Sequence, residues 1–448
     1  MEMNAFVHFT TNTFTDKEWG YGDENPAIFN PSSFDADAIV RVLKDAGSKG
    51  VILTCKHHDG FCLWPTETTE HCIRNSPYKA GRGDIVKEIS EAAARHGLKF
   101  GVYLSPWDRN NAAYGTPRYI EIYRKQLREL LTGYGSLFEI WHDGANGGDG
   151  YYGGAREKRT IDKMHYYDWS KTWALERELQ PRAAIFSDVG PDVRWVGNEK
   201  GIAGETCWAT YTPLSPRGGP GSPGDIVERE ATSGTRDGKY WMPAECDVSI
   251  RPGWFWHASE NAKVKTAREL LQLYYDSVGR GASFLLNVPP DRRGLIHESD
   301  ASSLREFGRL LKASFATNLA SDAGIRASNV RAKHPAYDAQ HLVDGKRDTY
   351  WTTDDSITTA EVLFDFPARK SFNLVRIREH IPLGQRVSEF AVDYWDAAQW
   401  QSFGKGTSIG LCRILRVDAP VAASRIRLRV LKSAACPAIS EFGVFQEA

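Results

Sequence analysis

The strongest candidate for chemistry is an aspartate at the end of an apolar segment. Residues 137–144 read LFEIWHDG, a run of apolar and β-prone residues that ends in Asp143 and a glycine. Such a run is typical of a buried strand. The ANGGDG segment that follows is too rich in Gly, Asn and Asp to continue the strand. Active sites of parallel α/β barrels form where strands end, so Asp143 is our candidate reacting group.

Other reactive side chains follow further strand-like segments of the first two thirds of the chain. No fold needs these residue types for packing, and together they predict one rim crowded with His, Trp, Asp and Glu. They are His8, His57, His58, Trp107, Asp188, the segment from Arg194 to Glu199, Glu245 and Asn287.

Glycoside hydrolysis is a reaction that such residues can perform. It needs two carboxyl groups, about 5–5.5 Å apart when the mechanism retains configuration. One must stay ionised as nucleophile, and the other needs a raised pKa to act as acid. Asp143 suits the first role. Glu199 suits the second because it ends the segment GPDVRWVGNE, beside a Trp and two glycines. Alternatives for the acid stay open at Asp188, Glu205 and Glu245.

A metal-dependent barrel hydrolase is the main alternative among enzymes, since such barrels also use His and Asp at strand ends. Neighbouring residues on a strand point to opposite faces, so His57 and His58 can share one metal only if the backbone bends there. The chain has no H-x-H pair, no H-E-x-x-H and no G-x-S-x-G. Its seven cysteines contain no C-x-x-C pair, which argues against a zinc site or a disulfide framework.

Length and composition set the broad class. The chain has 448 residues, which predicts two domains or a barrel with an extra module. A formal net charge of −1 gives no indication of a nucleic-acid partner. No apolar window of about 18 residues predicts a membrane span. The first residues lack a signal-peptide pattern and lead straight into a strand, so we expect that an upstream leader was trimmed.

The order of segments predicts an α/β fold, a (β/α)8-like TIM barrel, over residues 1–315. Its strands are continuously apolar and alternate with helices, which is typical of a parallel sheet covered on both faces. No G-x-G-x-x-G follows the first strand, which argues against a dinucleotide-binding sheet. Expected strands are 5–9, 50–55, 99–104, 137–144, 183–187, 193–196, 240–245 and 283–289. Expected helices are 35–46, 84–96, 117–131, 167–179, 266–278 and 301–313.

The pattern changes after residue 316. Helical periodicity disappears, and short alternating strands separated by turns predict an all-β sandwich, of jelly-roll or discoidin-like type, for residues 316–448. Expected strands are 360–364, 374–379, 389–394, 414–417, 425–430 and 441–445.

Several motifs match a known enzyme family. They are FVHF at 6–9, NTFT at 12–15 with EWG at 18–20, KHHDGF at 56–61 with LWPT at 63–66, WHDG at 141–144, RPGWFWH at 251–257 and LLNV at 285–288. This set resembles the family-29 glycoside hydrolases, the α-L-fucosidases, over about residues 3–315. The resemblance implies a retaining mechanism with Asp143 as nucleophile. It also implies a fucose pocket lined by His8, Glu18, Trp19, His57, His58 and Tyr103. From the strand-end positions, we add Trp107, Arg194 and Trp195 as substrate-binding candidates.

The segment with Glu199 resembles the subfamily that prefers α-1,3/1,4-linked fucose on branched, Lewis-type glycans, and it implies that Glu199 is the acid/base. One departure from the family is His142, where many relatives carry an apolar or aromatic residue. We therefore predict a retaining exo-α-L-fucosidase that needs no cofactor for catalysis and acts on fucosylated oligosaccharides or glycoconjugates. A glycan-binding protein whose barrel has lost catalysis is the alternative from another class.

The C-terminal part contains LVDGKRDTYW at 342–351. This stretch resembles the discoidin-like F5/8 type C modules, which often bind carbohydrate. The resemblance implies a structural Ca²⁺ near Asp344 and Asp348, where oxygen ligands gather in one turn. A sandwich that only supports the barrel fits the sequence equally well. By family resemblance, we expect the protein to be periplasmic or secreted.

Overall fold

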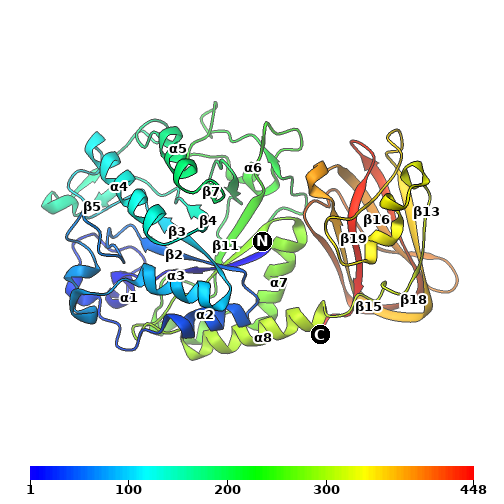
Figure 1. The fold of residues 1–448 in the computed structure, drawn as a ribbon, viewed down its shortest axis with the longest axis horizontal. Helices are drawn as coiled ribbons and strands as arrows, with labels where there is room; N and C mark the ends of the chain where they lie inside the picture. The colour runs from blue at the N-terminus through cyan, green and yellow to red at the C-terminus, as the bar shows by residue number, and fades with distance from the viewer.

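The computed structural model describes residues 1–448, and its two parts lie side by side (Figure 1). The N-terminal part is a closed parallel barrel with the strand order β1-β12-β11-β8-β7-β4-β3-β2. The barrel predicted from the sequence is therefore confirmed. Its strands are β1 (Met3–Val7), β2 (Gly50–Lys56), β3 (Lys99–Leu104), β4 (Leu137–Trp141), β7 (Ala184–Ser187), β8 (Val193–Trp195), β11 (Ala244–Ser249) and β12 (Ser283–Asn287).

Helices cover the outside of the barrel, although residues 188–192 join β7 to β8 without one. Their ends follow local sequence signals. The Asp84 side chain accepts from the Lys87 N–H at the start of α3, and Gly97 closes that helix at φ 74°. Thr266 and Glu269 form a capping box on α7. The helices are α1 (Thr11–Thr15), α2 (Ala36–Asp45), α3 (Ile85–His96), α4 (Pro117–Gly133), α5 (Trp169–Leu179), α6 (Glu228–Ser233), α7 (Ala267–Ser277) and α8 (Glu298–Ser314).

Two strand ends differ from the sequence prediction in ways that matter for the rim. The first strand ends at Val7, so His8 lies just beyond it. The seventh barrel strand is Ala244–Ser249, whereas the sequence predicted a strand at 240–245. Tyr240–Trp241 instead forms β10, which pairs with β9 (Thr210–Tyr211) outside the barrel.

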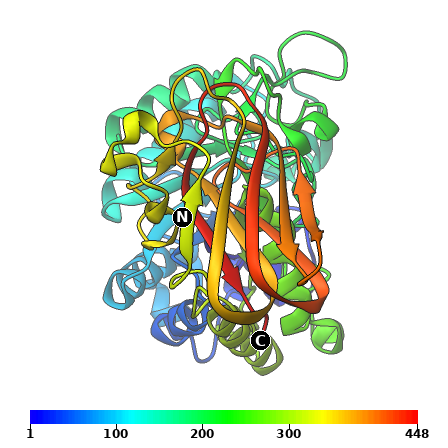
Figure 2. The same cartoon turned by 90° about the vertical axis from the view of Figure 1, so that its right-hand side faces the viewer.

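The C-terminal part is an antiparallel sheet domain whose strands lie in front of the barrel in Figure 2. Two of its strands are long, and breaks in register interrupt both, so the short strands expected at 360–364 and 374–379 are two halves of β15. The segments at 414–417 and 425–430 likewise belong to β18. The strands are β13 (Gly324–Ala327), β14 (Trp351–Thr352), β15 (Ala360–Glu379), β16 (Val387–Trp395), β17 (Trp400–Gly406), β18 (Arg413–Ser433) and β19 (Ala438–Phe445).

The two domains meet beside the start of β1 and along α7. Arg378 is almost fully buried there, with its guanidinium 2.6 Å from the Glu2 carboxylate and 2.9 Å from that of Glu441. The Tyr275 hydroxyl on α7 donates to Glu447 at 3.0 Å. These contacts lie away from the carboxyl ends of the barrel strands. None of the helices combines the length and the apolar character needed to cross a membrane.

Candidate active site

A cavity of about 440 Å³ opens at the carboxyl ends of the barrel strands. Nine of the side chains predicted from the sequence line it: His8, Trp19, His57, His58, Tyr103, Asp143, Asp188, Trp195 and Glu199. The cavity is further lined by Phe6, Trp141, Gly144, Ala145, Pro216, Gly224, Asp225, Ile226, Glu228, Asp247 and Trp254.

Asp143 lies just beyond β4, and two donors hold its carboxylate. The Tyr103 hydroxyl donates to Oδ2 at 2.9 Å, and the Ala145 N–H donates to Oδ1 at 2.6 Å. Burial raises the pKa of Asp143, while these two hydrogen bonds favour the ionised form and oppose that rise. Burial also raises the pKa of Tyr103, which keeps its hydroxyl protonated as a donor. Asp143 is thus an oriented carboxylate facing the cavity.

Three histidines beside Asp143 are buried and neutral. Burial lowers the pKa of His8 and of His58 to about 3, and it lowers that of His57 as well. The Ser105 hydroxyl donates to the Trp107 carbonyl at 2.7 Å, so the His58 Nδ1–H donates to Ser105 at 2.7 Å. His58 Nε2 is therefore an acceptor, and it lies 3.9 Å from Asp143 Oδ2.

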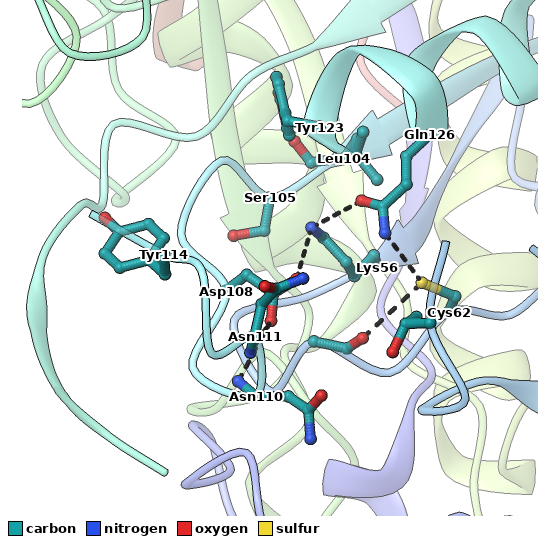
Figure 3. A network of polar contacts seen from close by, with 12 residues as sticks. Lys56, Cys62, Leu104, Ser105, Asp108, Asn110, Asn111, Tyr114, Tyr123 and Gln126 are labelled. Atoms are coloured by element: carbon teal, nitrogen blue, oxygen red, sulfur yellow. Dashed lines mark hydrogen bonds and ion pairs between the residues drawn. The ribbon is translucent and has the colours of Figure 1, made fainter. Parts of the chain in front are cut away.

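The chain bends where β2 ends, and both histidines that follow it face the cavity. Strand alternation predicts that His57 and His58 face opposite sides, but that alternation holds only within a strand, and β2 ends at Lys56. Their rings lie 4.1 Å apart, measured between centroids. The backbone before them is anchored by the buried Lys56 ammonium, which contacts Asp108 at 3.1 Å and donates to Gln126 at 2.9 Å (Figure 3).

Glu199 lies on the loop after β8, in a setting unlike that of Asp143. The Trp254 indole N–H donates to its carboxylate at 3.2 Å. Partial desolvation raises the pKa of Glu199, the negative charges of Asp143 and Glu18 raise it further, and the indole hydrogen bond opposes the rise. The site therefore combines a carboxylate held by two donors with a second, partly buried carboxyl group whose pKa is raised.

Glu18 and Trp107, both predicted as pocket residues, are not among the residues that line the cavity, but they contact residues that are. The Glu18 carboxylate accepts from the backbone N–H groups of Trp254 and Phe255 at 2.7 and 3.1 Å, and so holds the loop that carries Trp254. Trp107 packs against the His58 ring at 5.3 Å between centroids. Both side chains therefore help to hold cavity residues in place.

Arg194 does not reach the cavity, which corrects the expectation from the sequence. Its side chain is fully buried on the other side of β8, where Nε donates to the Ala231 carbonyl at 2.9 Å and Nη1 to the Met242 carbonyl. Residues alternate along a strand, so Trp195 faces the cavity and Arg194 faces away.

The other three candidates for the acid lie in different places, and only one of them lines the cavity. Asp188 lines the cavity, where it accepts from the Gly224 N–H at 2.6 Å, and burial raises its pKa to about 7. Glu205 is exposed on a loop beside the C-terminal domain. Glu245 lies inside the barrel below the cavity, hydrogen-bonded to the Trp141 indole at 3.1 Å.

Asp247 is a cavity residue that the sequence analysis missed. It is buried, burial raises its pKa, and its carboxyl accepts from the Trp195 indole at 2.8 Å. Strand alternation could have identified it, because residues 244–249 alternate inward and outward and Asp247 is two places beyond Glu245 on the inward face. The strand predicted at 240–245 ends before Asp247, so this residue was not predicted. Trp254 belongs to the RPGWFWH motif but was not chosen as a site residue.

No cluster of three or more His, Cys, Asp or Glu side chains has the geometry of a metal site. In the turn at Asp344, the carboxylate already accepts from the Lys346 N–H at 2.9 Å and the Thr349 hydroxyl at 2.7 Å. No group of side chains that could hold a metal ion is found at residues 344–349, so the calcium site expected from the resemblance is not shown.

A cavity lined by acids, histidines and aromatic rings, at the carboxyl ends of a closed parallel barrel, is the arrangement of barrel enzymes that hydrolyse sugars. A comparison with known families makes the assignment specific. The chain belongs to the alpha-L-fucosidase family, whose model matches residues 1–314, and an F5/8 type C domain matches residues 324–442.

Named relatives and solved structures support the same family assignment. The chain is 43% identical to alpha-L-fucosidase 1 of Arabidopsis thaliana over 99% of this chain and 85% of that protein. It superposes on a putative alpha-L-fucosidase from Bacteroides thetaiotaomicron with a TM-score of 0.89 and 38% identity, covering 100% of this chain and 95% of the other. A Ruminococcus gnavus GH29 fucosidase in complex with fucose gives a TM-score of 0.87 and 34% identity, covering 100% and 93%.

Proposed function

We propose that the protein is a retaining exo-α-L-fucosidase in which Asp143 is the nucleophile and Glu199 the acid/base. One observation carries the proposal: the two carboxyl groups face one cavity but have different partners. Asp143 accepts two strong hydrogen bonds that favour its ionised form, whereas desolvation and the charge of Asp143 raise the pKa of Glu199. A retaining glycosidase needs this division of roles.

The reaction follows in two steps. In the first, an Asp143 oxygen forms a bond to the anomeric carbon of fucose while the bond to the leaving oxygen breaks, and Glu199 gives that oxygen its proton. In the second, Glu199 takes a proton from water as the water oxygen attacks the anomeric carbon, and Asp143 leaves as a carboxylate. Each step inverts the anomeric carbon, so the released fucose retains its configuration. Two carboxyl groups perform this reaction without a cofactor.

The histidine wall suits a sugar with several hydroxyls and one methyl group. Neutral imidazoles can each accept from or donate to a hydroxyl without leaving a buried charge unpaired. His58 Nε2 and Asp143 Oδ2, which lie 3.9 Å apart, are both acceptors, so a sugar hydroxyl between them can donate to one of the two. The indole faces of Trp19 and Trp254 offer apolar surface for the ring and methyl group.

The cavity wall formed by residues 216–228 suits a branched aglycone, to which fucose is linked α-1,3 or α-1,4. The Gly224 N–H donates to Asp188 and anchors this wall. Asp225 and Glu228 of this wall, together with Asp188 beside Gly144, can accept hydrogen bonds from the hydroxyls of the sugars next to fucose.

The anomer that forms first tests the mechanism. Proton NMR during hydrolysis of an aryl α-L-fucoside should show α-L-fucose first, with β-L-fucose growing only as the sugar mutarotates. β-L-fucose as the first product would mean inversion and would rule out a covalent intermediate. No turnover in a folded sample that binds fucose would favour the glycan-binding alternative.

A substrate panel tests the linkage. We expect kcat/KM on Lewis-type trisaccharides to exceed that on an α-1,2-fucosylated lactose by about 100-fold. Asp188→Asn should lower kcat/KM on the trisaccharide about 10-fold and leave kcat/KM on the aryl fucoside within about twofold. The reason is that only the trisaccharide reaches the wall at residues 216–228, which Asp188 anchors. Asp192→Asn on the same loop, which pairs with Arg177 outside the cavity, is the matched control. An equal rate on the α-1,2 linkage would contradict the proposal.

We also propose that the enzyme acts in the periplasm or outside the cell. The family resemblance is the support for this proposal, since fucosylated glycans of this type are met there. Fractionation of cells that express the native gene, with activity assayed in each fraction, tests it. Activity confined to the cytoplasm would contradict it.

A further inference from the structure

His142 immediately precedes Asp143, yet its side chain points out of the barrel. Trp141 and Asp143 line the cavity, whereas the His142 ring is fully buried among the helices that cover β4. Its closest aromatic neighbour is Trp169 at the start of α5, with 5.1 Å between the ring centroids. This orientation follows from strand alternation, and it places a polar ring directly behind the carboxylate that attacks in the proposed reaction.

One ring nitrogen connects β4 to β3 through α4. The Tyr123 hydroxyl on α4 donates to the Leu104 carbonyl at 3.0 Å, and Figure 3 shows these two residues together. That hydroxyl has one hydrogen, so His142 Nδ1–H donates to the Tyr123 oxygen at 2.9 Å. Leu104 follows Tyr103, whose hydroxyl holds Asp143. The two strands that carry Tyr103 and Asp143 are therefore joined twice, inside the barrel and behind it.

The other ring nitrogen connects β4 to α5. His142 Nε2 lies 2.8 Å from Glu176 Oε1, and both side chains have no exposed surface. Two lone pairs facing each other at this distance would repel, so a proton lies between the two groups and joins them. No other basic side chain pairs with Glu176.

We propose that Glu176, His142 and Tyr123 form a positioning device that sets the place of Asp143 relative to Tyr103. The inference rests on the proposed function, in which Asp143 is the nucleophile. The physical reason is that attack on the anomeric carbon depends steeply on geometry: a displacement of 1 Å can cost about 100-fold in rate. The three side chains come from α5, β4 and α4, so together they fix the end of β4 against two helices and, through Leu104, against β3.

The test separates positioning from folding. Glu176→Gln keeps the shape of the side chain but replaces the carboxyl group with an amide, and we expect kcat on an aryl α-L-fucoside to fall about 10-fold while KM stays within about twofold. The double variant His142→Phe/Glu176→Leu replaces the buried polar pair with apolar groups of similar size, which should keep the thermal midpoint near that of the parent chain. Its kcat should fall by a similar factor.

Glu139→Gln is the matched control, since Glu139 is a buried carboxyl group on the same strand but below the cavity. We expect its kcat to stay within about twofold of the parent value. Parental kcat in the folded double variant would overturn the positioning role. The outcome is distinct from a failure of the proposed function, because in that case Asp143→Ala would itself keep ordinary turnover.

Discussion

Two pairs of carboxyl groups at opposite ends of the barrel can be compared, and β4 or the residues just beyond it contribute to both. At the carboxyl ends of the strands, the upper pair, Asp143 and Glu199, faces a cavity of about 440 Å³. At the amino ends, the lower pair, Glu139 and Glu245, lies beside a cavity of about 940 Å³. Burial and the charge of Glu245 raise the pKa of Glu139 far above its usual range, so Glu139 is protonated and donates to Glu245.

The difference shows that neither cavity size nor two close carboxyl groups define an active site. The lower pair shares one proton, and the Trp141 indole and the Ser283 hydroxyl, each at 3.1 Å, hold Glu245. In the upper pair, each group has its own setting: two hydrogen bonds hold Asp143, whereas Glu199 accepts one, from the Trp254 indole, and lies near the charge of Asp143. Different settings of this kind allow one group to act as nucleophile and the other as acid.

Loss of Asp143 should have the largest effect of any single substitution. Asp143→Ala removes the proposed nucleophile, and we expect kcat on an aryl α-L-fucoside to fall by about 10⁴-fold or more. Sodium azide should restore part of the turnover and yield β-L-fucosyl azide, because a single displacement inverts the anomeric carbon. Ordinary activity in a folded Asp143→Ala sample would contradict the assignment.

Glu199→Ala should act mainly on substrates with poor leaving groups. We expect kcat/KM to fall about 10³-fold on a fucosylated trisaccharide and less on an aryl fucoside, whose leaving group needs no proton. Azide should here give α-L-fucosyl azide, since it attacks a covalent intermediate. Opposite azide anomers from the two variants would identify Asp143 as the nucleophile and Glu199 as the acid/base. A fully active Glu199→Ala enzyme would contradict this assignment and move the acid role to Asp188.

Tyr103→Phe tests the partners of the nucleophile. Losing this donor destabilises the ionised form of Asp143, so its raised pKa rises further and the acidic limb of the kcat/KM profile moves to higher pH. At pH 7 we expect kcat to fall about 10- to 100-fold, as for other charge-stabilising donors. An unmoved acidic limb would mean that Tyr103 does not set the ionisation of Asp143.

Glu139→Gln should change stability rather than activity. The folded protein keeps Glu139 protonated, whereas the unfolded chain loses that proton above about pH 4.5, so the free energy of unfolding of the parent chain falls as pH rises beyond that point. One such proton gives a slope of at most about 1.4 kcal/mol per pH unit. Urea unfolding between pH 5 and 8 should show a shallower slope in the variant. Equal slopes would mean that Glu139 is not the group responsible.

Sequence patterns predicted the barrel and most of the site because strand ends are local signals. Asp143 and His8 each follow an apolar run that stops at a residue unsuited to the core, and in a parallel barrel all such positions meet at one rim. The hydrogen-bond partners of Asp143 were harder to predict from the sequence. Tyr103 was inferred through the family resemblance, and the Ala145 N–H depends on a backbone turn that side-chain types do not specify.

Errors arose where orientation depends on the register of a strand. Arg194 and Trp195 are neighbours on β8 and cannot both face the cavity, so including both was inconsistent with strand alternation. Asp247 was hidden because the β11 strand begins later than the apolar pattern indicated. In the C-terminal domain, β15 and β18 lose their alternation where their register breaks, so each was predicted as two short strands.

The central claim is that the carboxylate at the end of β4 forms a bond to fucose. A 2-fluoro-substituted fucosyl fluoride slows the second step more than the first, so the sugar should accumulate on the protein. Peptide mass spectrometry should then find one fluorofucosyl adduct, on the peptide that contains Asp143. An adduct on another carboxylate, or no adduct while the enzyme still turns over ordinary substrate, would contradict the account.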